Sequence, residues 1–226
     1  MSDTYEADDL AGTLAGKYRE SMTVRLVSKD RDYLQLVSNE YDVRLWVPAS
    51  EKDAEDARKG ASLYTGDSFT VPDFMKHFIE YTDQAVYADK GVYPGNIPDL
   101  KAIEGDSSDN IPGVKGVSSA AAPLIGDTEE WKGIYEAIDS CGGDAKQEKE
   151  LADFWKTALS ISRSPVNALK RDREMAFLSL DLATIRTYCD EALDFNLEAS
   201  PVKDADFKKL NGKLLDLGIK NARFEE

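Results

Sequence analysis

The first fifty residues alternate between helical and strand-like patterns, which restricts the chain to a small set of folds. Residues 5–17 place apolar side chains at helical spacing, and residues 33–37 indicate a short second helix. Segment 23–27 is β-branched and apolar, and segment 41–47 alternates apolar with polar side chains. Helices that alternate with short strands are typical of an α/β fold with parallel strands. We therefore expect a parallel sheet in this part of the chain.

The segment that follows has a weaker pattern. Residues 50–70 are polar and show little periodicity. A helix is predicted after Pro72, with Phe74, Phe78 and Ile79 as its apolar face.

The second half of the chain reads as mainly helical. From residue 99 onward the composition shifts to Gly, Asp and Ser and then to Ala, which indicates a loop, a tight turn and a helix of small residues. Helical patterning continues from about Trp131 to the end. Residues 178–185 alternate apolar and polar side chains, so they predict either a strand or an extended crossing.

Three short acidic motifs are the candidate functional residues. The first motif lies at the start of the first predicted helix. The second follows the first predicted strand, and open α/β sheets place their functional sites at the carboxyl ends of strands. The third lies in the glycine-flanked loop. The acidic residues of the three motifs are Glu6, Asp8 and Asp9; Asp30 and Asp32; and Asp106 and Asp109.

Seven carboxylates brought together by the fold would repel one another, and divalent cations would relieve that repulsion. Two such ions about 3.5–4 Å apart can hold a scissile phosphate and stabilise the leaving oxygen. Each motif taken alone is more often a helix cap or a solvated loop. The metal-site hypothesis therefore depends on the motifs converging in space.

The charge balance opposes nucleic-acid binding. The chain has 43 acidic and 28 basic residues, a formal net charge of −15. Nucleic-acid binders are usually basic, because phosphate contacts supply most of their affinity. Binding would require that metal ions neutralise part of the acid or that the basic residues gather on one face. A solvated acidic protein with no nucleic-acid role stays open as an alternative.

Other sequence features exclude several classes of protein. No apolar run approaches the roughly 18 residues of a membrane span, and the acidic, polar start does not resemble a secretory signal, so we expect a soluble cytoplasmic protein with no membrane partner. Cys141 and Cys189 need no disulfide and have no zinc-ligand neighbours. His77 is the single histidine, which argues against a histidine-based triad.

Taken together, four segments resemble the 5′-3′ exonuclease (flap endonuclease) family, whose bacterial members are often fused to DNA polymerase I. The matching segments are 5–15, 26–37, 91–117 and 177–185, in the order of the family. The run GDSSDNIPGVKG is the most specific of them. The resemblance implies an α/β fold with a partial, parallel-sheet, PIN-like nuclease core over residues 1–95, carrying an insertion near 50–80. A mainly helical region over residues 96–226 would follow.

The resemblance also implies a chemistry: a two-metal-dependent 5′-3′ exonuclease or 5′-flap endonuclease that acts on DNA with Mg²⁺ or Mn²⁺. One metal ion would be held by Glu6, Asp8 and Asp9. The other would be held by Asp30, Asp32, Asp106 and Asp109. Of these seven residues, the first five are the candidate catalytic residues.

Residues 113–122 match the family's helix–three-turn–helix element, which grips duplex phosphates, often around a K⁺ ion. The resemblance assigns DNA contacts to Gly113, Val114, Lys115, Gly116 and Ser118. Glycines let the backbone approach a phosphate, a helix N-terminus favours an anion, and Lys115 adds positive charge. A glycine-rich turn between two packed helices is the alternative for this segment alone. The serine departs from the family, which usually has another glycine at that position.

The largest departure from the family lies upstream. The family normally begins with an aspartate-bearing strand, a second aspartate and a basic arch, whereas Glu6 stands six residues from the start of this sequence. Three explanations stay open: a truncated chain, one half of a split nuclease completed by a second polypeptide, or a non-catalytic module that binds DNA ends or junctions. A DNA polymerase is a further expected partner.

Overall fold

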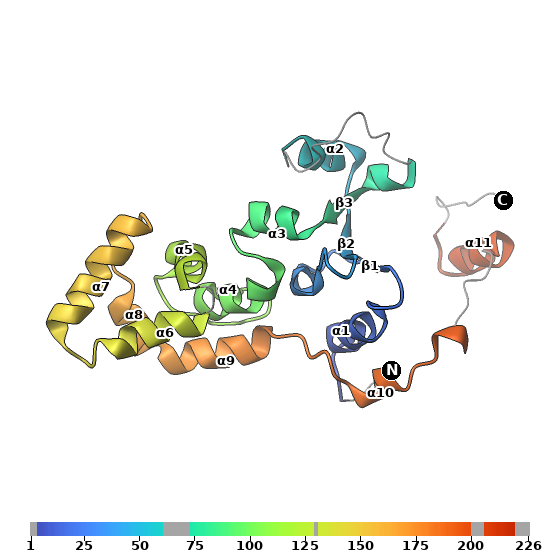
Figure 1. The fold of residues 1–226 in the computed structure, drawn as a ribbon. Helices are drawn as coiled ribbons and strands as arrows, with labels where there is room; N and C mark the ends of the chain where they lie inside the picture. The colour runs from blue at the N-terminus through green and yellow to red at the C-terminus, as the bar shows by residue number, and fades with distance from the viewer. Residues whose placement is uncertain (1–3, 61–72, 129–130, 200–205, 220–226) are drawn as a thin grey trace. The chain divides into compact units, whose positions relative to one another are not determined.

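The computed structural model describes residues 4–60, 73–128, 131–199 and 206–219. The chain divides into two compact units, Met1–Leu193 and Asp194–Glu226. Figure 1 shows its helices and strands coloured along the sequence. A functional division near residue 95 stays a prediction.

The first unit contains a three-stranded sheet in the order β1-β2-β3. After helix α1 (Ala7–Tyr18), strand β1 (Val24–Val27) pairs in parallel with β2 (Val43–Pro48). A 3₁₀ helix, η1 (Asp32–Leu36), connects the two strands. Every second residue of β2, from the first to the fifth, is buried. The expected alternation of helices and parallel strands is confirmed.

The prediction of an α-helix after Pro72 is wrong. A short 3₁₀ helix, η2 (Asp73–His77), leads into strand β3 (Phe78–Tyr81), which runs antiparallel to β2. Two of the predicted face residues, Phe78 and Ile79, thus lie in a strand; Pro72 and the Phe74 side chain lie outside the described residues. Pairing with a distant strand decided the outcome, and local periodicity does not report such pairing.

The weakly patterned segment before it contains a helix that the sequence analysis did not predict, α2 (Glu51–Gly60). Ser50 caps its start, donating to Asp53 and accepting that residue's backbone N–H. Residues 61–72, the middle of the predicted insertion near 50–80, lie outside the described residues.

The remaining elements of the first unit are helices, as predicted for the region from residue 96 onward; the elements at 83–90 and 94–96 were not predicted. They are α3 (Asp83–Lys90), η3 (Pro94–Asn96), α4 (Ile97–Glu104), α5 (Ser118–Thr128), α6 (Trp131–Ser140), α7 (Ala145–Ala158), α8 (Val166–Arg171), α9 (Arg173–Ala183) and α10 (Asp190–Leu193). Helix α4 lies against α9 and α5 (Figure 1) and buries Ala102 and Ile103 completely. The second unit contains η4 (Leu197–Ala199) and α11 (Phe207–Asp216). Among the described helices, none is long and apolar enough to cross a membrane.

The prediction of a strand or extended crossing over residues 178–185 is wrong for most of that segment, because α9 continues to Ala183. Ala176, Ser179 and Ala183 are buried at helical spacing. These small side chains let α9 pack against α4, and the exposed leucines between them produced the misleading alternation.

The loop between α4 and α5 is compact because its backbone crosses itself. Asp106 and Ile111 exchange two backbone hydrogen bonds of 2.8 Å, and the Val114 N–H donates to the Ile103 carbonyl at 2.8 Å. Gly113 has φ +57°, and a Cβ atom there would lie 2.3 Å from the Gly105 nitrogen. This crossing requires glycine.

Replacing Gly113 by alanine should therefore lower the free energy of unfolding by about 2–4 kcal/mol, from left-handed strain and overpacking together. Gly126→Ala is the control, because nothing lies within 4 Å of a Cβ atom in that helical position; it should raise stability by about 0.5–1 kcal/mol. Urea denaturation measures both. Equal stability of the two variants would contradict the crossing.

Candidate functional site

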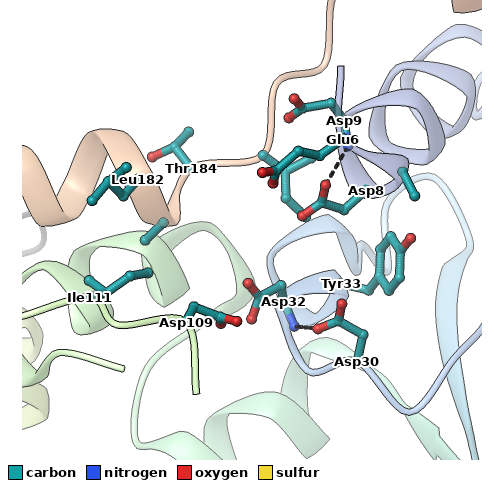
Figure 2. A pocket seen from close by; sticks show the side chains of 13 residues that line it. Glu6, Asp8, Asp9, Asp30, Asp32, Tyr33, Asp109, Ile111, Leu182 and Thr184 are labelled. Carbon is teal, nitrogen blue, oxygen red and sulfur yellow. Dashed lines mark hydrogen bonds between the residues drawn. The ribbon is translucent and has the colours of Figure 1, made fainter. Parts of the chain in front are cut away.

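Carboxylates line one side of a cavity of about 440 Å³ in the first unit (Figure 2). The acidic residues around it are Glu6, Asp8, Asp9, Asp30, Asp32 and Asp109. Ile111, Leu182 and Ile185 add apolar surface. The lining comes from α1, the turn after β1, the loop after α4 and the end of α9, which are far apart in the sequence.

Local hydrogen bonds shape the turn after β1. The Asp30 N–H donates to the Ser28 hydroxyl at 3.1 Å, and the Asp32 N–H donates to the Asp30 carboxylate at 3.0 Å. These bonds bend the chain between β1 and η1, and Asp32 lines the cavity.

Among the described residues, Asp32, Asp106 and Asp109 form the tightest acidic group. One oxygen of each lies within 4.8 Å of the other two. Figure 2 shows Asp32 and Asp109 pointing toward one another. Hard oxygen donors at this spacing suit a divalent cation such as Mg²⁺ or Mn²⁺.

The Lys101 ammonium group, from the last turn of α4, lies among these three carboxylates. It is hydrogen-bonded to Asp32, lies 2.7 Å from the nearest Asp106 oxygen and 3.8 Å from that of Asp109. Its side chain is only 13% exposed, so water screens the interaction weakly. Lys101 was not among the predicted site residues; a lysine one turn ahead of an acidic loop was the available signal.

The shared cation leaves the carboxylates with different acidities. Burial raises the pKa of Asp32, and its bonds to Lys101 offset this only in part because Asp30 and Asp109 add negative charge nearby. Burial also opposes ionisation of Asp106, but Lys101 and two bonds from Ser108 outweigh it and lower its pKa to about 2. Asp106 is therefore ionised at a lower pH than Asp32.

Burial works against the charge of Lys101, yet its bonds to Asp106 and Asp32 outweigh that effect and raise the pKa of the ammonium group. The Lys101 ammonium group therefore neutralises part of the negative charge of these carboxylates.

The acids of α1 line the same cavity without joining this tight group. The Asp9 carboxylate accepts the Arg186 N–H at 2.7 Å, and Asp8 accepts the Asp9 N–H at 3.0 Å. In Figure 2, Glu6 and Asp8 point into the cavity, whereas Asp9 turns toward the segment after α9. Burial raises the pKa of Tyr33, and Asp8 and Asp30 raise it further.

The predicted DNA-binding turn joins the α4–α5 loop to the start of α5. Gly113 and Gly116 have φ values of +57° and +82°. The Lys115 side chain is exposed, whereas Val114 is buried, so only the backbone of this valine could meet a ligand. Ser118 is the first residue of α5.

Two family models match the chain. One, described as a 5′-3′ exonuclease N-terminal resolvase-like domain, matches residues 1–65. The other, a 5′-3′ exonuclease C-terminal SAM fold, matches residues 92–208.

Curated relatives agree with these models. DNA polymerase I of Mycobacterium leprae is 33% identical over 231 residues, covering 95% of this chain and 22% of the relative. DNA polymerase I of Caldicellulosiruptor bescii is 28% identical over 219 residues, 96% of this chain and 20% of the relative. A 5′-3′ exonuclease of Bacillus subtilis is 36% identical over 153 residues, 66% of this chain and 43% of the relative.

The chain thus spans about a fifth of the length of these polymerases. The resolvase-like match falls on the α/β part, and the SAM-fold match falls on the helical part. The chain belongs to the 5′-3′ exonuclease family.

Proposed function

We propose that this chain supplies the metal-binding and DNA-binding parts of a 5′-3′ DNA exonuclease or 5′-flap endonuclease that uses two Mg²⁺ or Mn²⁺ ions. The observation that carries the proposal is the group of Asp32, Asp106 and Asp109, with one oxygen of each within 4.8 Å of the others and further carboxylates around the adjoining cavity. Membership of the exonuclease family supports the same chemistry.

The donor set fits hard divalent ions. Asp32, Asp106 and Asp109, with Asp30, would hold one ion, and Glu6, Asp8 and Asp9 would hold the other. Such ions, when bound, stabilise the charge that develops on a phosphodiester during hydrolysis. The position of Lys101 supports this assignment, because a cation already compensates the three carboxylates.

Duplex DNA with a 5′ end or flap is the proposed substrate. The turn formed by Gly113, Val114, Lys115, Gly116 and Ser118 would bind its phosphates, with K⁺ as an additional ion. Lys115 would provide a direct charge contact. Bound metal ions would neutralise part of the acidic excess that opposes DNA binding.

A second polypeptide and a DNA polymerase are the proposed partners, in the cytoplasm. The names of the polymerase relatives support the latter. Strand β1 supports the former, because it lies at the edge of the described sheet and exposes 58% of Val27. An added strand could pair with that edge.

A non-catalytic module that binds DNA ends or junctions is the second candidate. The bond between Asp9 and the Arg186 N–H favours it, since this carboxylate is already engaged by the protein.

Cleavage of a 5′-flap duplex in Mn²⁺ separates the two candidates. Asp32→Asn should reduce the cleavage rate at least about 100-fold, because it weakens the proposed metal site, while Asp153→Asn, an exposed aspartate of α7, should leave it unchanged. Duplex binding without cleavage, even with an added N-terminal polypeptide of the family, would support the binding module. Neither binding nor cleavage would contradict both candidates.

Mn²⁺ binding tests the competition with Lys101. Lys101→Met removes the ammonium group from the carboxylates, so Mn²⁺ affinity should rise about tenfold or more. Titration followed by electron paramagnetic resonance measures the free ion. Lys156→Met, an exposed lysine of α7, should have no effect. Unchanged affinity in Lys101→Met would place the metal elsewhere.

DNA binding at several salt concentrations tests the turn. Lys115→Met should weaken binding to all duplex sequences alike and reduce the slope of log affinity against log salt by about one. Fluorescence anisotropy gives both quantities. A slope equal to that of the parent chain would show that this lysine contacts no phosphate.

A further inference from the structure

The junction between α8 and α9 and the middle of α9 hold the backbone of the proposed DNA-binding turn. The buried Ser179 hydroxyl accepts the Gly113 N–H at 3.0 Å, and the Asp172 carboxylate accepts the Lys115 N–H at 3.1 Å. The Arg171 guanidinium donates to the Lys115 carbonyl at 3.3 Å. Both polar backbone groups of Lys115 are therefore bonded to a segment 56–57 residues later in the chain.

Asp172 is suited to this role because it is itself fixed in place. Arg171 donates to its two carboxylate oxygens at 2.7 and 2.6 Å. These bonds, with the Lys115 N–H, lower the pKa of Asp172 to about 2, so it is ionised at neutral pH. An ionised acceptor forms a stronger bond with a backbone N–H than a neutral one.

The bonds determine which amides of the turn remain available. The N–H groups of Gly113, Val114 and Lys115 all donate to acceptors within the protein. The next amide, of Gly116, has no acceptor among the residues that the structure describes, whereas the Ala120 N–H in the first turn of α5 donates to the Val117 carbonyl at 2.8 Å. An anion would meet the turn from this side.

We propose that Asp172 and Ser179 are positioning residues for DNA binding. They direct the amides of Gly113 and Lys115 into the protein, and so leave the Gly116 amide, beside the start of α5, to meet a duplex phosphate. This inference rests on the proposed function, in which this turn binds DNA.

Because Asp172 is negatively charged, the direction in which DNA affinity changes on its removal distinguishes a positioning role from simple repulsion. A carboxylate near a phosphate-binding turn repels DNA, so its removal should tighten binding if electrostatics alone matters. A positioning role requires the opposite result.

The experiment measures duplex binding by fluorescence anisotropy, with the full chain, across several salt concentrations. Asp172→Ala should weaken binding about five- to tenfold and reduce the salt slope. Asp172→Asn, which keeps an acceptor for the Lys115 N–H, should recover most of the affinity. Glu174→Ala is the control: it removes an exposed acid from the same first turn of α9 and should bind equally or slightly more tightly.

Ser179→Ala provides a second test without a change of charge. It should also weaken duplex binding and accelerate hydrogen exchange of the Gly113 amide, whereas Ser140→Ala, an exposed serine of α6, should do neither. Circular dichroism at the assay temperature confirms that each variant is folded, and if Asp172→Ala is not, Ser179→Ala decides.

Binding by Asp172→Ala or Ser179→Ala that equals or exceeds that of its control overturns the positioning role while leaving the proposed function intact. Absence of duplex binding by the parent chain overturns both.

Discussion

The candidate site depends on the balance between three carboxylates and one ammonium group. Two unit charges 4.8 Å apart interact by about 3 kcal/mol at an effective dielectric constant of about 20, before further screening by salt. Asp32, Asp106 and Asp109 would therefore oppose the folded arrangement if they stood alone. Lys101 compensates them, and its position on α4 links this balance to the most buried helix of the first unit.

The loop between α4 and α5 contributes both to the proposed metal site and to the proposed DNA-binding turn. The α4–α5 loop begins with the acids that face Lys101 and ends with the turn held by α9. Because Gly105 and Gly113 cross at close contact, a shift in one half would move the other. The geometry thus couples the proposed metal site to the proposed DNA-binding turn through backbone atoms.

Much of this arrangement could be predicted from the sequence. The parallel strands β1 and β2 follow from local periodicity, and the placement of Asp30 and Asp32 after β1 follows from the usual location of sites in α/β sheets. Strand β3 could not be predicted, since its conformation depends on pairing with β2. Helix α9 was mistaken because its buried face consists of small residues, which carry little hydrophobic signal.

Within the site, the acidic residues could be recognised by type and spacing, but their partners could not. Lys101 lies 69 residues from Asp32, and Asp172 lies 57 residues from Lys115. These pairs exist only once α4, α9 and the loop are packed. The bond between Asp9 and Arg186, which crosses 177 residues, is of the same kind.

Diffraction from crystals grown in Mn²⁺ tests the central claim most directly. The account predicts an anomalous peak within coordination distance of Asp32, Asp106 and Asp109, with the Lys101 ammonium withdrawn from them. No peak at saturating Mn²⁺, with Lys101 still between the carboxylates, would contradict it.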